Sequence, residues 1–124
     1  MNRPTVLCVE DDSTLSNAFG AFLGSSGYHV LLAKDGGQAL VAFRHSHIDA
    51  VLVDDYQKSG ASGCEVAAEI KQNSPATPVI LVSSLQNVLE EARNYVDATL
   101  SKGADLGQVL AQVNALLPNS GLHA

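Results

Sequence analysis

The sequence predicts an α/β domain in which helices cover both faces of one five-stranded parallel sheet. Short runs of consecutive apolar residues, typical of strands buried on both faces, alternate with segments in which apolar residues recur at helical spacing. Five such strand–helix pairs, (βα)5, follow one another within 124 residues, a length that fits one domain. This alternation favours parallel strands joined by right-handed crossovers, doubly wound in the flavodoxin-like order 2-1-3-4-5.

The first strand is predicted from the apolar run Val6 to Val9, which leads directly into the acids Glu10, Asp11 and Asp12. Such a run indicates a buried strand whose carboxyl end delivers charge to the edge of the sheet. The other strands are expected at residues 28–33, 48–53, 79–82 and 98–100, and a polar loop at residues 56–63.

Helices are expected where apolar residues share one helical face, at residues 13–24, 38–45, 64–73, 85–95 and 105–117. Asp12 or Ser13 can cap the first helix, and for Asp12 we favour this role over a ligand role. Asp35, Gly36 and Gly37 are expected to form a turn before the second helix. The domain is then expected to cover residues 1–118, with a tail at residues 119–124.

The composition narrows the function classes. Thirteen acids against seven Lys and Arg give a net charge of −6, which argues against a nucleic-acid-binding surface and suits a divalent cation. No apolar run approaches the roughly 20 residues of a membrane helix, so we expect a cytoplasmic protein that binds no membrane. Its two cysteines do not make a disulfide framework, and Cys8 is expected to fill space in the core.

Polar residues that could form one site follow four of the five predicted strands, and parallel strands bring their carboxyl ends to one edge. They are Glu10 and Asp11 after the first strand, Asp54 and Asp55 after the third, Ser83 after the fourth and Lys102 after the fifth. Carboxylates suit a hard cation such as Mg²⁺ or Mn²⁺. A carboxylate beside that ion can attack phosphorus and form an acyl phosphate, while a lysine and a hydroxyl stabilise the phosphoryl oxygens.

These motifs, in this order and spacing, resemble the receiver domains of two-component response regulators over nearly the whole chain. The pieces that carry the resemblance are Val-Leu-Cys-Val-Glu10-Asp11-Asp12, Gly27-Tyr28, Asp35-Gly36-Gly37-Gln38-Ala39-Leu40, Asp49-Ala-Val-Leu-Val-Asp54, Pro78-Val-Ile-Leu-Val-Ser83-Ser84 and Leu100-Ser101-Lys102. The resemblance implies that Glu10 and Asp11 form the acidic pair, with Asp11 the direct metal ligand. It also implies that Ser83 is the hydroxyl that follows the phosphoryl group and that Lys102 pairs with that group.

Two neighbouring aspartates compete for the role of phosphoacceptor. Counted forward from Ala39 and Asp49, the spacing of the family falls on Asp54, whereas counted back from Gly63 it falls on Asp55. We assign the extra residue to the loop, because loops accept insertions more easily than buried strands. Asp54 is therefore the predicted acceptor and Asp55 the alternative.

The main-chain carbonyl of Tyr56 or Gln57 is expected to complete the metal site, as the resemblance implies. Three positions depart from the family: Lys58-Ser59 replaces a Met-Pro or Leu-Pro pair, Gly103 replaces a proline, and Thr99 replaces a Tyr or Phe. The ion and phosphoryl chemistry is complete in the sequence, whereas the relay to a partner surface is altered.

The expected function is a phosphorylation switch. A histidine kinase or phosphotransfer protein donates to the acceptor with Mg²⁺ bound, and the change biases a surface that binds a downstream protein. The chain would catalyse its own phosphorylation and dephosphorylation only. The alternative is a docking module that works without phosphorylation. A metal-dependent phosphatase is disfavoured because Glu10-Asp11-Asp12 lacks Asp-x-Asp spacing, and a flavin carrier because the first loop is too acidic.

Overall fold

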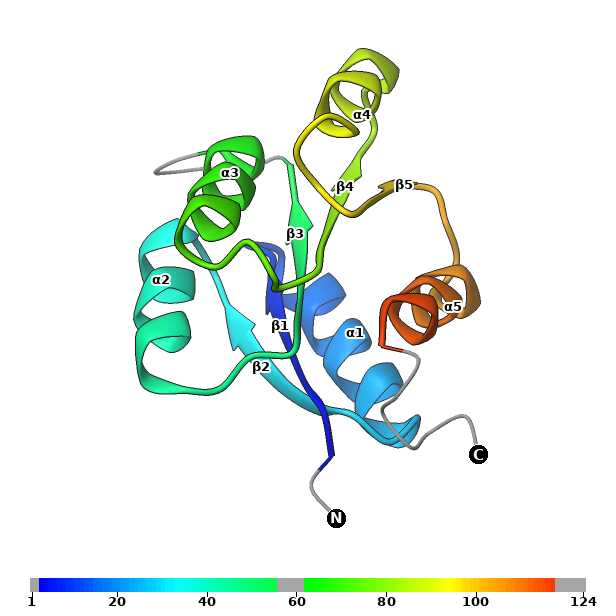
Figure 1. The fold of residues 1–124 in the computed structure, drawn as a ribbon. Helices are drawn as coiled ribbons and strands as arrows, with labels where there is room; N and C mark the ends of the chain where they lie inside the picture. The colour runs from blue at the N-terminus through cyan, green and yellow to red at the C-terminus, as the bar shows by residue number, and fades with distance from the viewer. Residues whose placement is uncertain (1–2, 56–61, 118–124) are drawn as a thin grey trace.

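The computed structural model describes residues 3–55 and 62–117, and its architecture is the one that the sequence predicts. Five parallel strands form one sheet in the order β2-β1-β3-β4-β5, with a helix after each strand (Figure 1). The elements are β1 (Thr5–Val9), α1 (Ser13–Ser25), β2 (His29–Ala33), α2 (Gly36–His45), β3 (Ala50–Asp54), α3 (Gly63–Asn73), β4 (Val79–Ser83), α4 (Gln86–Ala92), β5 (Ala98–Ser101) and α5 (Leu106–Leu116). The predicted tail at residues 119–124 lies outside the described residues.

Alternation along the strands divides the core between the two faces of the sheet. Leu7 and Val9 of β1 point to the face covered by α2, α3 and α4, and Val6 and Cys8 point to the face covered by α1 and α5 (Figure 1). The middle strands β1, β3 and β4 are buried almost throughout. Cys8 is 1% exposed, which confirms its predicted place in the core.

The register of the sheet brings several strand ends level with one another. Val9 of β1 pairs with Val53 of β3, so the residue that follows each of them reaches the same edge. On the other side of β3, Asp54 pairs with Val82 of β4. The polar residues at the ends of β1, β3 and β4 therefore lie next to one another, on strands that are buried in the core.

Side-chain caps fix where the helices that flank this edge begin. The carboxylate of Asp12 accepts a 3.0 Å hydrogen bond from the backbone N–H of Leu15, which confirms Asp12 as the cap of α1. Asp35 caps α2 in the same way through the N–H of Gln38. The predicted turn at Asp35, Gly36 and Gly37 is therefore wrong in part, because this cap allows the helix to begin at Gly36.

Helix α4 is shorter than predicted, since it ends at Ala92 rather than at residue 95. The N–H of Asn94 donates to the carbonyl of Glu91, and the N–H of Tyr95 donates to the carbonyl of Ala92. These bonds join residues three positions apart, as in a 3₁₀-helix, so the α-helical pattern ends here. The helix also begins without a side-chain cap at Leu85. This short helix lies next to the edge that carries the polar residues (Figure 1).

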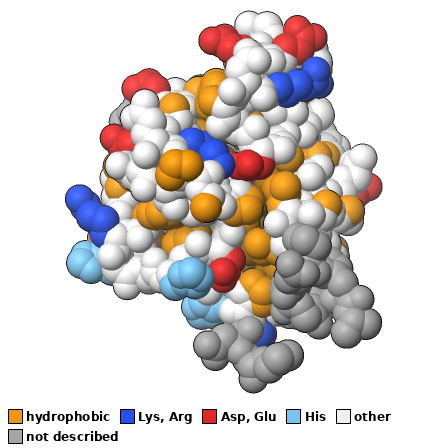
Figure 2. Space-filling model, in the orientation of Figure 1, with side chains coloured by type: hydrophobic (Ala, Val, Ile, Leu, Met, Phe, Trp, Pro, Cys, Tyr) orange, Lys and Arg blue, Asp and Glu red, His pale blue; other side chains and the backbone are white. Residues whose placement is uncertain are grey.

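The described surface has two further features. Among residues 3–55 and 62–117, no helix combines the length and the apolar character that crossing a bilayer requires. On the face drawn in Figure 2, acidic, basic and apolar side chains are interspersed, and the Lys and Arg side chains do not gather into one patch there.

Candidate functional site

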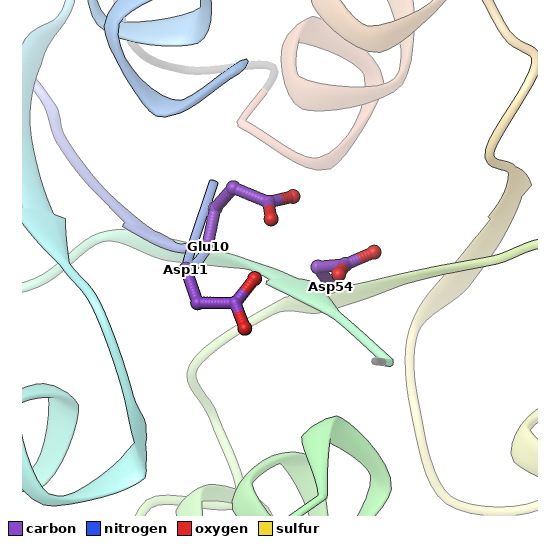
Figure 3. Close-up of side chains that lie close together, drawn as sticks. All are labelled: Glu10, Asp11 and Asp54. Carbon is purple, nitrogen blue, oxygen red and sulfur yellow. The ribbon is translucent and has the colours of Figure 1, made fainter. Parts of the chain in front are cut away.

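Three carboxylates converge where β1 and β3 end. Glu10 and Asp11 follow β1, and Asp54 is the last residue of β3. Figure 3 shows the side chains of Glu10 and Asp11 extending toward the side of Asp54. One carboxylate oxygen from each residue lies within 4.8 Å of the other two. The sheet register produces this cluster, because Val9 and Val53 are paired and each precedes one of its members.

The cluster is largely withdrawn from water, and this affects its charge. Glu10 is 3% exposed and Asp54 is 4% exposed. Burial raises the pKa of Glu10 to about 6, although a 3.2 Å hydrogen bond from the backbone N–H of Asp12 acts in the opposite direction. Burial also raises the pKa of Asp54, and the nearby Lys102 offsets only part of this rise, while the charge of Asp11 adds to it.

Lys102 supplies the positive charge of the site. Its Nζ donates a 2.7 Å hydrogen bond to Oδ1 of Asp54 and lies 4.0 Å from Oε1 of Glu10. The backbone N–H of Lys102 donates to the carbonyl of Ser83, which fixes the lysine against the end of β4. Burial alone would lower the pKa of Lys102, but the carboxylates outweigh it and the pKa is raised. The lysine therefore stays protonated beside the cluster.

The donor set fits a hard divalent cation. Oε1 of Glu10 is buried and accepts no hydrogen bond from any group in residues 3–55 and 62–117. A buried carboxylate oxygen without a donor is costly, and a bound cation would compensate it. Carboxylate oxygens gathered at this spacing are the ligands that Mg²⁺ prefers. The predicted carbonyl ligands, Tyr56 or Gln57, lie outside the described residues.

The two remaining predicted residues, Ser83 and Asp55, contact each other. The hydroxyl of Ser83 donates a 3.2 Å hydrogen bond to Oδ2 of Asp55, and the thiol of Cys64 donates a 2.9 Å bond to Oδ1. Asp55 and Asp54 are consecutive, so their side chains leave the chain on opposite sides of the sheet plane. The structure thus groups Glu10, Asp11, Asp54 and Lys102, and it pairs Ser83 with Asp55. A cavity of about 330 Å³ adjoins this group and this pair. It is lined by Asp54, Asp55, Ser83, Ser84, Leu85 and Lys102.

Two residues of the site have no assigned role in the sequence-based prediction. Cys64 holds Asp55, and Gly63 lets α3 approach the end of β3. A Cβ atom at Gly63 would lie 2.1 Å from the carbonyl oxygen of Asp54 and 2.6 Å from Cα of Asp55. Only glycine fits such an approach between backbones. The available sequence signal was a glycine just before the predicted helix and a small residue at the start of that helix.

Comparison with known proteins identifies the family of this chain. The family model of the response regulator receiver domain matches residues 6–114, which is most of the chain. The chain belongs to the response regulator receiver domain family. This finding confirms the family that the motifs around Glu10, Asp54 and Lys102 predict. Receiver domains are components of two-component signalling systems, and this chain carries such a domain.

Relatives with the same domain come from several bacteria. Response regulator RR06 of Streptococcus pneumoniae is 31% identical over 115 residues, which cover 90% of this chain and 52% of that protein. The chain thus spans about half the length of this curated relative, and less of others. Response regulator TrrA of Thermotoga maritima, in a crystal structure with Mg²⁺ and beryllofluoride, is 25% identical with a TM-score of 0.85, covering 92% of this chain and 99% of that one. A CheY-like receiver domain of Methanospirillum hungatei shares the fold with a TM-score of 0.86, at 21% identity over 99% of this chain and all of that one.

Proposed function

We propose that this receiver domain accepts a phosphoryl group on Asp54 from the phosphohistidine of a histidine kinase or phosphotransfer protein. One observation carries the proposal: the buried carboxylate of Asp54 lies between the ammonium group of Lys102, at 2.7 Å, and the acidic pair of Glu10 and Asp11. A nucleophile, a cation and a metal-ligand pair are the parts that phosphoryl transfer to a carboxylate needs.

In the proposed reaction a carboxylate oxygen of Asp54 forms a bond to phosphorus. The bond between phosphorus and the imidazole nitrogen of the donor breaks, and its electron pair stays on that nitrogen. Lys102 is placed to compensate the negative charge that develops on the phosphoryl oxygens. Glu10, Asp11 and Asp54, with the carbonyl of Tyr56 or Gln57, would hold Mg²⁺ or Mn²⁺. When bound, this ion supplies further charge neutralisation at the phosphoryl oxygens.

The hydrogen bonds of the two aspartates favour Asp54 over Asp55 as the acceptor. Both oxygens of Asp55 accept hydrogen bonds, from Ser83 and from Cys64. Asp54 instead contacts Lys102, whose side chain is long and flexible. Its ammonium group can turn from Asp54 toward a phosphoryl oxygen. Asp55 remains the alternative acceptor, and separate substitutions of the two residues distinguish them.

Phosphorylation would act as a local change of charge. A phosphoryl group adds about −1.5 to −2 charges at neutral pH. This charge next to Lys102 would rearrange the neighbouring loops and bias a surface that binds a downstream protein. We place this switch in the cytoplasm, where kinases with phosphohistidine act. The chain would turn over no separate substrate, and its chemistry would be limited to its own phosphorylation and dephosphorylation.

A docking module that works without phosphorylation is the second candidate. Two positions that depart from the family favour this alternative: Thr99, three residues before Lys102, and Gly103, directly after it. It predicts that binding to the downstream partner does not change when beryllofluoride and Mg²⁺ are added. The phosphorylation switch predicts that such binding changes.

Incubation with acetyl phosphate tests the proposal directly. Intact-mass spectrometry should detect one added phosphoryl group when Mg²⁺ is present and none when EDTA removes the metal. Asp54→Asn should abolish the addition, whereas Asp55→Asn, which removes the same charge one residue away, should retain it. Loss of the addition in Asp55→Asn alone would transfer the role to Asp55, and no addition to the wild type would refute the proposal.

A further inference from the structure

The hydroxyl of Ser83 makes two hydrogen bonds, to Asp55 and to Leu85. It donates a 3.2 Å hydrogen bond to Oδ2 of Asp55, and its oxygen accepts a 3.0 Å bond from the backbone N–H of Leu85. Ser83 is 2% exposed, so water does not compete freely for these bonds. Because residues 83 and 55 lie on the same side of the sheet plane, the contact follows from the pairing of Asp54 with Val82.

Asp55 is held firmly enough to determine where the Ser83 hydroxyl points. Its backbone N–H donates to the carbonyl of Val82, and its carbonyl accepts from the N–H of Gly63. Oδ1 accepts a 2.9 Å hydrogen bond from the thiol of Cys64. Burial, and then the hydrogen bond to Asp55, raise the pKa of Cys64 to about 11, so the thiol keeps the proton that it donates. The second oxygen, Oδ2, is thereby fixed in front of Ser83.

A serine hydroxyl has one proton and can donate it to one acceptor at a time. The cavity that adjoins Asp54 is lined by both Ser83 and Asp55, so a phosphoryl group on Asp54 would enter the space next to this hydroxyl. For Ser83 to donate to a phosphoryl oxygen, its bond to Asp55 must break. The carboxylate of Asp55 and the phosphoryl group are both anionic acceptors, and they compete for the same proton.

We infer that Asp55 is a positioning residue that holds the Ser83 hydroxyl in the unphosphorylated protein and competes for it with the phosphoryl group on Asp54. This inference rests on the proposed function. The wild-type chain accordingly stabilises a phosphoryl group on Asp54 less than a variant in which the Ser83 hydroxyl is released from Asp55. Asp55 thus sets the threshold for the switch without touching the phosphoryl group.

A double-mutant cycle on beryllofluoride binding tests the inference. Beryllofluoride with Mg²⁺ imitates a phosphoryl group on a carboxylate, and calorimetry gives its dissociation constant for the wild type, Asp55→Ala, Ser83→Ala and the double variant. Removing one competing hydrogen bond should tighten binding by roughly 2- to 12-fold in the Ser83 background. Asp55→Ala also removes a negative charge, which favours binding of the beryllofluoride anion whether or not Ser83 is present. In the Ser83→Ala background, the part of the gain in affinity that comes from releasing the hydroxyl should therefore disappear.

Two controls separate positioning from a general effect of charge or folding. Glu69→Gln removes the same charge from the exposed face of α3 and should leave the dissociation constant unchanged. Asp55→Leu provides a second variant of similar size whose side chain has no oxygen to accept from Ser83, in case Asp55→Ala unfolds. The backbone amide of Leu85, which donates to Ser83, reports the hydroxyl by NMR. In the metal-free Asp55→Ala protein its resonance should move toward its position in the wild-type beryllofluoride complex.

The outcomes are distinguishable. A gain in affinity that is several-fold larger when Ser83 is present, together with the shifted Leu85 amide, supports the inference. Equal gains with and without Ser83 overturn it and leave the proposed function intact. If the wild type fails to bind beryllofluoride with Mg²⁺, the proposed function and the inference fall together.

Discussion

Substituting Glu10 by glutamine should stabilise the metal-free protein above neutral pH, even though Glu10 belongs to the proposed metal site. Burial raises the pKa of this carboxyl from 4.5 to about 6. Each unit corresponds to about 1.4 kcal/mol, so ionised Glu10 destabilises the folded state by up to about 2 kcal/mol. Glutamine keeps the shape of the side chain and an oxygen that can accept from the N–H of Asp12, and it removes the charge.

The sign of the pH dependence follows from the raised pKa. The destabilisation by Glu10 is absent below about pH 4.5, where the carboxyl is protonated in the folded and unfolded states alike. It grows between about pH 4.5 and pH 6 and is fully present above the folded pKa. In EDTA, Glu10→Gln should therefore exceed the wild type by up to about 2 kcal/mol near pH 8 and by much less near pH 4.5.

Urea unfolding measures this difference, and Mg²⁺ should reverse its sign. A ligand present at about 100 times its dissociation constant stabilises the folded protein by about 2.7 kcal/mol. The wild type should gain this stabilisation from Mg²⁺, and Glu10→Gln should gain much less because a metal ligand is lost. A Glu10→Gln protein that is less stable than the wild type near pH 8 in EDTA, or a difference that does not vary with pH, would show that ionised Glu10 does not destabilise the fold.

Three further predictions concern neighbouring residues. Lys102→Met removes the 2.7 Å contact with Asp54, and because the lysine is about one third exposed we expect a loss of about 1–3 kcal/mol near pH 8 by urea unfolding, and a smaller loss near pH 5. Gly63→Ala forces a Cβ against the backbone of Asp54 and should destabilise the protein by about 2 kcal/mol or more in thermal unfolding; Gly24→Ala, with no atom within 4 Å of the new Cβ, should not. The thiol of Cys64, whose pKa is raised to about 11, should react slowly with iodoacetamide near pH 8, and faster in Asp55→Asn because the negative charge that favours the protonated thiol is lost. A Gly63→Ala protein of wild-type stability, or an alkylation rate that does not change in Asp55→Asn, would contradict these accounts.

The fold could be predicted from the sequence because its signals are local. The run from Val6 to Val9 is buried on both faces and therefore carries no polar residue, which distinguishes it from a surface strand. Boundaries were less accurate where competing contacts decide them. Asp35 can belong to a turn or cap a helix, and the structure selects the cap through the N–H of Gln38.

The sequence predicted the cluster of carboxylates but not the contact of Ser83 with Asp55, because that contact depends on the register of the strands. Pairing of β1 with β3 gathers Glu10, Asp11 and Asp54, as expected from strand ends that meet at one edge. The contact of Ser83 with Asp55 depends on which side of the sheet each side chain leaves. A shift of register by one residue reverses that side, and the sequence does not determine the register of β3 against β4. The predicted carbonyl ligand at Tyr56 or Gln57 stays a prediction, because both residues lie outside the described part of the chain.

Locating the phosphorylated residue shows whether Asp54 is the acceptor. After incubation with acetyl phosphate and Mg²⁺, borohydride reduces an aspartyl phosphate to homoserine, and peptide sequencing by mass spectrometry locates the changed residue. We expect homoserine at position 54 alone, and none when EDTA is present. Homoserine at position 55, or modification that persists without a divalent ion, would contradict this expectation.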